Sequence, residues 1–151
     1  MTNINLIGEK FNNAKAHKFT QSELTEIKDL IRVNFKFMGK KLVTVKRQVS
    51  LEEFKLNYGH GIALVSGLYA QTDYLNATYN CMLRALHDRH HLSLNRGLSV
   101  ADEIYVGQNW NSQSKLMNAF YRSEVCYQAA YYHKYGQFIK NQKVVLENLF
   151  I

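Results

Sequence analysis

The chain has 151 residues, 46% of them hydrophobic, and a formal net charge of +7 at neutral pH. Because this length buries a core of ordinary size, we expect a single domain over residues 1–151. No apolar run approaches the roughly 20 residues of a membrane-spanning helix, and the two cysteines have no metal-ligand spacing around them. The sequence therefore predicts a cytoplasmic protein without a membrane segment, and its positive charge favours an acidic partner.

The first predicted helix begins after residue 20. Residues 1–19 show no regular apolar period, whereas residues 20–23 have the spacing of a capping box. From there Leu24 and Ile27 begin the apolar side of a helix, with charged residues on its other side. The lack of proline in the whole chain suits long helices of this kind.

A β-hairpin is predicted for residues 33–49. Aromatic and β-branched residues stand at every second position from Val33 to Phe37, and valines alternate again after a turn at residues 39–40. Such alternation around a glycine-containing turn is typical of two paired strands. An alternative interpretation extends the preceding helix to Met38 and leaves one isolated strand.

The predicted hairpin is basic throughout. No acidic residue lies between Leu30 and Leu51. Lysines on a hairpin can follow a phosphate backbone, and the alternative is that they protect an exposed edge strand from pairing with other chains. We predict that the segment binds nucleic acid or a protein that handles nucleic acid. The predicted contact residues are Arg32, Lys36, Lys40, Lys41, Lys46 and Arg47.

The longest helical pattern covers residues 61–94. It follows a short predicted helix, which a second capping box opens at residues 50–53. Within the long pattern, Leu68, Leu75 and Leu86 belong to a stripe with steps of three or four residues. Such a stripe predicts a helix that turns one side to a core, and we expect the rest of the chain to pack around it.

Two further helices are predicted in the second half of the chain. One starts at Ser99, and the other covers residues 115–135 and carries five of the ten tyrosines. Glu124 falls near the centre of the apolar side of this tyrosine-rich helix. Because burial of an ionised carboxylate is costly without a partner, Glu124 is a candidate functional residue.

A weak metal-binding pattern surrounds the histidines of the long helical stretch. His87 and His91 are one helical turn apart, a spacing that two metal ligands can use, and Asp88 is adjacent. His60 and Glu124 are further candidate ligands from elsewhere in the chain. The alternative interpretation is that the two histidines lie at a helix end, where positive charge interacts well with the helix dipole.

The run Ala-Leu-His-Asp that ends at Asp88 resembles the His-Asp pair of the HD-domain metal phosphohydrolases, a helical family. The resemblance implies a metal-dependent phosphohydrolase in which His60 stands for the family's earlier histidine. It covers four contiguous residues and one distant histidine, and no aspartate follows Asp102 in the position of the family's later ligand. Metal-dependent hydrolysis is therefore the alternative prediction.

The sequence as a whole predicts an α+β protein that is predominantly α-helical, a long-helix bundle with a small N-terminal β-hairpin. The main functional prediction is a non-enzymatic binding protein without a cofactor, acting as an adaptor or inhibitor towards nucleic acid or a nucleic-acid-handling protein. The residues after Gln142 end in an apolar tail, which suggests a homo-oligomer that forms through this tail.

Overall fold

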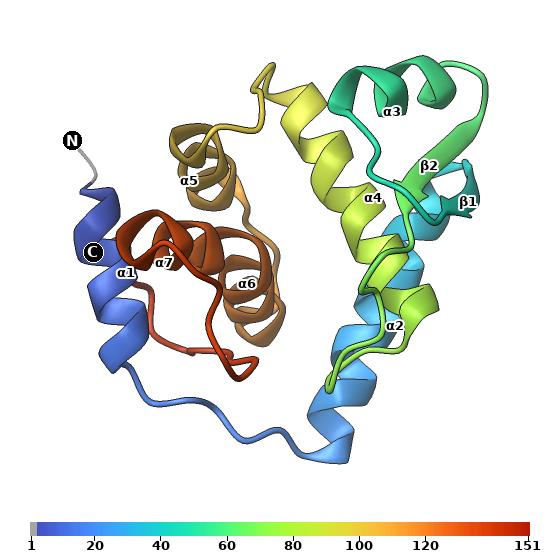
Figure 1. Ribbon diagram of the computed structural model, residues 1–151. Helices are drawn as coiled ribbons and strands as arrows, with labels where there is room; N and C mark the ends of the chain where they lie inside the picture. The colour runs from blue at the N-terminus through green and yellow to red at the C-terminus, as the bar shows by residue number, and fades with distance from the viewer. Residues whose placement is uncertain (1–2) are drawn as a thin grey trace. The chain divides into compact units, whose positions relative to one another are not determined.

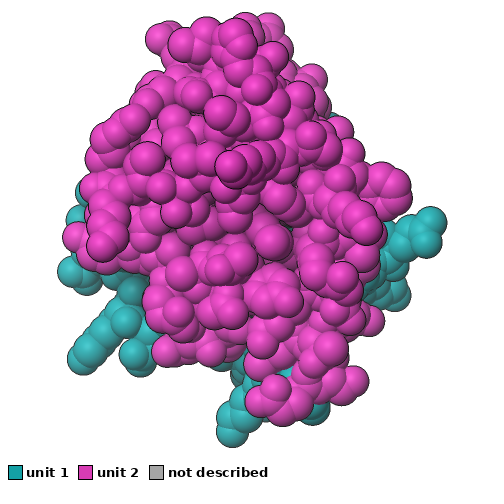
Figure 2. All heavy atoms as spheres, turned by 90° about the vertical axis from the view of Figure 1, so that its right-hand side faces the viewer, with its two compact units in different colours: residues 1–20, 96–151 teal, residues 21–95 magenta. Residues whose placement is uncertain are grey.

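The computed structural model describes residues 3–151 (Figure 1). The chain forms two compact units, which Figure 2 colours separately: unit 1 combines Met1–Thr20 with Arg96–Ile151, and unit 2 is Gln21–Asn95. Helices make up 56% of the chain, and two short strands form one small sheet. The predicted α+β class with predominant helix is confirmed. That residues 1–151 form a single domain stays a prediction.

Unit 2 is built around a two-stranded parallel sheet. Its elements are α2 (Gln21–Met38), β1 (Lys41–Val45), α3 (Leu51–Tyr58), β2 (Ile62–Ser66) and α4 (Ala77–Ser93). Strands β1 and β2 pair in parallel, with Lys41 opposite Ile62. Helix α4 packs against α2 and against both strands, and α3 contacts β2 (Figure 1). The sequence β1–α3–β2 is thus a βαβ connection with a short helix.

The predicted hairpin is wrong, because its first half is the end of helix α2. Met38 is buried, as are Ile27 and Ile31 at helical spacing before it, so the core selects the helical period over the alternating one. Gly39 has a φ of +65° and follows the last helical residue, as a left-handed glycine at a helix end does. The alternative interpretation, a helix that continues to Met38, is confirmed. Strand β1 is nevertheless paired, with β2 in place of a hairpin partner.

The helix predicted for residues 61–94 is also wrong in its first half. The apolar run Ile62–Ser66 forms strand β2, with Ala63, Leu64 and Val65 buried. Helix α4 begins only after Asn76, whose side chain accepts a hydrogen bond from the Tyr79 backbone N–H at 3.1 Å. Short apolar runs are compatible with strand or helix, and here pairing with β1 decides for the strand.

Several predicted helix starts are confirmed, two of them by a capping hydrogen bond. Helix α2 starts directly after Thr20, as the first capping box predicted. Ser50 caps α3 by accepting a hydrogen bond from the Glu53 N–H at 3.1 Å. Ser99 caps α5 in the same way through the Asp102 N–H. These contacts join residues three apart, so the local sequence is enough to predict them.

Unit 1 brings the two ends of the chain together. Its helices are α1 (Ile4–Asn13), α5 (Val100–Asn109), α6 (Lys115–Tyr121) and α7 (Gln128–Tyr135), and the π-helix η1 (Arg122–Tyr127) joins α6 to α7. The predicted helix over residues 115–135 is therefore continuous. Helix α1, for which the sequence showed no regular period, packs along α7 (Figure 1). A β-carbon at Gly8 would lie 2.7 Å from the Ala130 carbonyl oxygen, so only glycine allows this approach.

Side chains of η1 hold the last part of the chain against unit 1. Ser123 Oγ accepts a hydrogen bond from the Val145 N–H at 3.0 Å, and the Tyr127 hydroxyl accepts one from the Leu149 N–H at 2.9 Å. Val145 and Leu149 are both buried. Part of the apolar tail is thus used inside unit 1, and assembly of several copies through it stays a prediction. No helix in residues 3–151 is long and apolar enough to cross a membrane.

Candidate functional site

The basic segment is divided between the two ends of strand β1. Lys36 lies in the last turn of α2, and Lys40 and Lys41 stand where β1 begins. Lys46 and Arg47 follow the end of the strand. Since a five-residue strand is roughly 16 Å long, the two groups do not meet at one point. The six predicted contact residues therefore form two basic regions instead of one hairpin surface.

The two arginines of the segment are paired with carboxylates. Both terminal nitrogens of Arg47 bind Glu53, at 2.8 Å to Oε1 and 2.5 Å to Oε2. This hydrogen bonding raises the pKa of Arg47 and lowers the pKa of Glu53. Arg32 lies 3.4 Å from Asp29 on the same helix. Arg47 thus ties the loop after β1 to the first turn of α3.

Within residues 3–151, the lysines of the basic segment, unlike its arginines, are not paired with carboxylates. Lys36, Lys41 and Lys46 are exposed, and Lys40 is half-buried, with its ammonium 4.4 Å from the centre of the Tyr58 ring. Among the residues that the structure describes, no carboxylate is within ion-pair distance of these four lysines. Their positive charge remains available to a partner.

An exposed aromatic ring accompanies three of the lysines. Phe37 is 84% exposed and lies directly after Lys36 at the end of α2. We call Lys36, Phe37, Lys40 and Lys41 the Lys/Phe patch. The alternating pattern had assigned Phe37 to a strand. Its signal in the sequence is the helical period, because a helix that buries Met38 turns the preceding residue away from the core.

The histidine candidates lie on two elements of unit 2. His87 and His91 are on adjacent turns of α4, with their Nε2 atoms 2.9 Å apart. His60 is exposed in the turn between α3 and β2. Within the described part of the chain, no set of three or more potential metal ligands includes His60, Asp88 or Glu124. The structure brings His87 and His91 together, but it does not assemble the ligand set that the HD-domain resemblance implies.

His90 lies between these two histidines in sequence. Burial lowers its pKa to about 4, and the positive charges that His87, His91 and Arg89 can carry act in the same direction. His90 is therefore neutral at physiological pH. It does not add to the basic character of the chain.

Glu124 lies in the π-helix η1 of unit 1. Its Oε2 accepts a hydrogen bond from Gln142 Nε2 at 2.8 Å, whereas its Oε1 is shielded from water and has no partner in residues 3–151. Burial raises the pKa of Glu124 to about 7, and the hydrogen bond from Gln142 partly opposes this shift. Glu124 is thus a proton-binding group that titrates near neutral pH. π-Helical turns frequently occur at functional sites.

The two cysteines are buried, one in each unit. Burial raises the pKa of Cys81 and, more strongly, that of Cys126. A thiol with a raised pKa is protonated at neutral pH and is a poor nucleophile. Neither cysteine has the environment of a catalytic residue.

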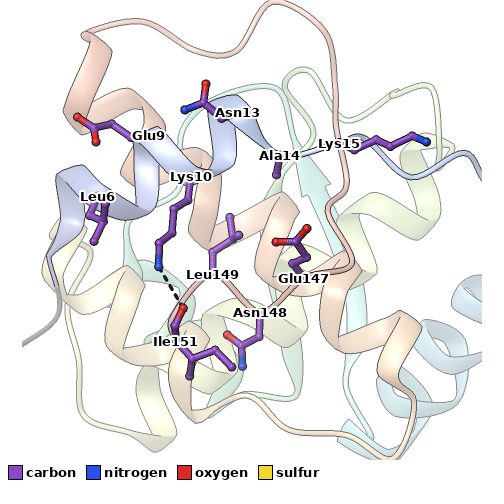
Figure 3. A pocket seen from close by; sticks show the side chains of 10 residues that line it. All are labelled: Leu6, Glu9, Lys10, Asn13, Ala14, Lys15, Glu147, Asn148, Leu149 and Ile151. Carbon is purple, nitrogen blue, oxygen red and sulfur yellow. Dashed lines mark hydrogen bonds between the residues drawn. The ribbon is translucent and has the colours of Figure 1, made fainter.

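A pocket of about 530 Å³ lies on unit 1 between α1 and the last residues of the chain (Figure 3). Lys10 extends along it and donates a hydrogen bond to the Ile151 oxygen at 3.0 Å. Glu9, beside it, is paired with Lys134 at 3.0 Å. Both acidic and basic side chains line the pocket, so its charge favours no single class of ligand.

Similarity to other proteins assigns no role to these sites. No model of a known protein family, no curated protein and no solved structure matches the chain.

Proposed function

We propose that the protein binds nucleic acid through the Lys/Phe patch. The observation that carries this proposal is the exposed ring of Phe37 beside lysines that lack carboxylate partners. Lysine ammonium groups neutralise phosphates and release counterions. An exposed aromatic ring offers a face on which a base stacks. The patch combines both elements within residues 36–41.

The state of the arginines favours single-stranded nucleic acid bound without sequence preference. Arginine commonly reads a guanine edge through two parallel hydrogen bonds. Arg47 already uses both terminal nitrogens on Glu53, and Arg32 contacts Asp29. Stacking on Phe37 requires a base that is not enclosed in a duplex, and every base has a face to stack. The Lys40 ammonium already lies over the Tyr58 ring, so its side chain loses less conformational entropy when it binds a phosphate.

Charge reversal at Lys40 and Lys41 tests the binding of phosphates. In the double variant Lys40→Glu/Lys41→Glu, binding of a fluorescent single-stranded oligonucleotide should weaken. The slope of log affinity against log salt should fall by about 0.7 for each phosphate that a lysine no longer neutralises. Fluorescence anisotropy at several salt concentrations measures both quantities. The matched control is Lys15→Glu/Lys18→Glu, which changes the net charge equally at exposed lysines of unit 1.

An unchanged salt slope in the first variant, or an equal change in the control, would contradict the proposal. A third outcome points to a protein partner. In it, the unaltered chain binds no oligonucleotide but captures a protein from nuclease-treated extract, and the variant Lys40→Glu/Lys41→Glu does not capture that protein. In that case the same lysines serve an acidic protein surface, and nucleic-acid binding is wrong.

Replacement of Phe37 tests the stacking of a base separately. Phe37→Ala should weaken oligonucleotide binding by about 5- to 150-fold, the range that corresponds to about 1–3 kcal/mol for one stacked base. The salt slope should stay unchanged, because the lysines that neutralise phosphates are all retained. The control is Leu56→Ala, which removes another exposed apolar side chain of unit 2. Equal weakening by both variants would show that the Phe37 ring has no specific role.

A further inference from the structure

The imidazole rings of His87 and His91 converge on one point. They lie on adjacent turns of helix α4, entirely within unit 2. Their Nε2 atoms share a hydrogen bond of 2.9 Å, in which one nitrogen donates its proton to the other, and their ring centres are 4.5 Å apart with an angle of 71° between the planes. Side chains four residues apart share a helix face, so this convergence follows from the backbone of α4.

The chemistry of two facing imidazole nitrogens suits a metal ion. A neutral imidazole carries its proton on one nitrogen and a lone pair on the other. When a metal ion replaces the proton that the two rings share, that proton moves to Nδ1 or to water, and both Nε2 lone pairs are directed at the ion. Zinc–nitrogen bonds of 2.0–2.1 Å in tetrahedral geometry place two ligand nitrogens about 3.3 Å apart. The observed distance of 2.9 Å is close to that value, so the two nitrogens would have to move apart only slightly to hold the ion.

We infer that His87 and His91 form a binding site for a divalent transition-metal ion of the zinc class, chelated through their Nε2 atoms. Imidazole is a preferred ligand of zinc, copper and nickel. Two histidines at positions i and i+4 of a helix are a recurring pair of zinc ligands. The pair supplies two of the ligands that such an ion requires.

Arg84 lies three residues before His87 on the same helix α4, and two backbone carbonyl groups hold its guanidinium in place. Its guanidinium donates hydrogen bonds to the carbonyl oxygens of Ser66 at 2.6 Å and Leu68 at 2.8 Å. Arg84 thus serves the loop after β2. The metal site uses no residue of the Lys/Phe patch, so metal binding and nucleic-acid binding can be tested independently.

Titration of the metal-free full chain with Zn²⁺ tests the site. The protein is prepared without a histidine tag, and calorimetry measures stoichiometry and affinity. We expect one ion per chain, with affinity at least about tenfold weaker in His87→Ala and in His87→Gln. His60→Ala and His133→Ala remove exposed histidines outside the pair and should bind as the unaltered chain does.

Imidazole nitrogen resonances of the unaltered chain give a readout that needs no variant. On addition of Zn²⁺, the Nε2 signals of His87 and His91 should shift while their Nδ1 atoms keep the proton. Circular dichroism of each variant establishes that it is folded, and His87 is only half-buried. Unchanged Nε2 signals at saturating Zn²⁺, or equal affinity in His87→Gln and the unaltered chain, would overturn the inference.

Discussion

Replacing Phe11 with alanine is expected to lower the free energy of unfolding of unit 1 by about 3–5 kcal/mol. The Phe11 side chain is completely buried, and its ring lies 5.7 Å from that of Tyr127 and 6.4 Å from that of Tyr131. Alanine leaves a cavity that helices packed on both sides cannot close fully. Urea unfolding followed by circular dichroism measures the loss of stability.

Phe11 also anchors both ends of the chain to unit 1. The Lys143 ammonium donates a hydrogen bond to the Phe11 carbonyl oxygen and lies 5.3 Å from the centre of its ring. Loss of the Phe11 ring therefore weakens the packing of the segment around Lys143 as well as the packing of α1. A loss of stability below about 1 kcal/mol would contradict this packing, because that is the range of many ordinary substitutions.

The matched control is Phe37→Ala, which removes the same side chain from an exposed position. Its effect on stability should stay within about 0.5 kcal/mol. Amide hydrogen exchange of Phe11→Ala adds a test of the single-domain prediction. Equal loss of protection in unit 1 and unit 2 would establish one cooperative domain, whereas loss confined to unit 1 would establish two.

Glu124→Gln is expected to stabilise the protein above neutral pH and to change little in acid. The pKa of Glu124 is about 7 in the folded chain, against an ordinary value of 4.5. Below pH 4.5 the Glu124 carboxyl group is protonated in both the folded and the unfolded chain, so its burial carries no ionisation cost. As the pH rises from 4.5 to about 7, the carboxyl group of the unfolded chain loses its proton first, and the folded state becomes less stable relative to the unfolded state. The total loss is about 3 kcal/mol once the pH exceeds the folded-state pKa.

Glutamine mimics the protonated carboxyl group and cannot ionise. The stability difference between Glu124→Gln and the unaltered chain should therefore grow by about 3 kcal/mol between about pH 4 and pH 8. Urea unfolding at intervals across this range measures it. Glu147→Gln is the control, since it makes the same chemical change at an exposed position of unit 1. A pH-independent difference for Glu124→Gln would mean that its carboxyl group titrates alike in both states.

Local chemistry explains the parts of the fold that were predictable. At Ser50 and Ser99 the confirmed helix start depends on a side chain and a backbone N–H three residues apart. Glu124 stood out because a single carboxylate interrupted the apolar side of a helix, and the structure places it beside Gln142 with Oε1 unpartnered. Signals of this kind need no knowledge of distant residues.

The incorrect predictions share one physical cause. Residues 33–38 and 62–66 are short segments whose apolar positions suit either a strand or a helix. Burial of Met38 in unit 2 selects helix for the first run. Parallel pairing with β1, across the intervening helix α3, selects strand for the second. Neither choice is encoded within the run itself.

The sequence by itself determined the helical class, the starts of α2, α3 and α5, and the concentration of positive charge between Leu30 and Leu51. Only the tertiary structure decided which of these charges are available. Arg47 is neutralised by a carboxylate that the turn into α3 brings to it, while Lys36 and Lys41 stay exposed beside Phe37. The physical reason is that a residue's type sets its charge, whereas the charge's partner and exposure depend on groups that only the folded chain brings near.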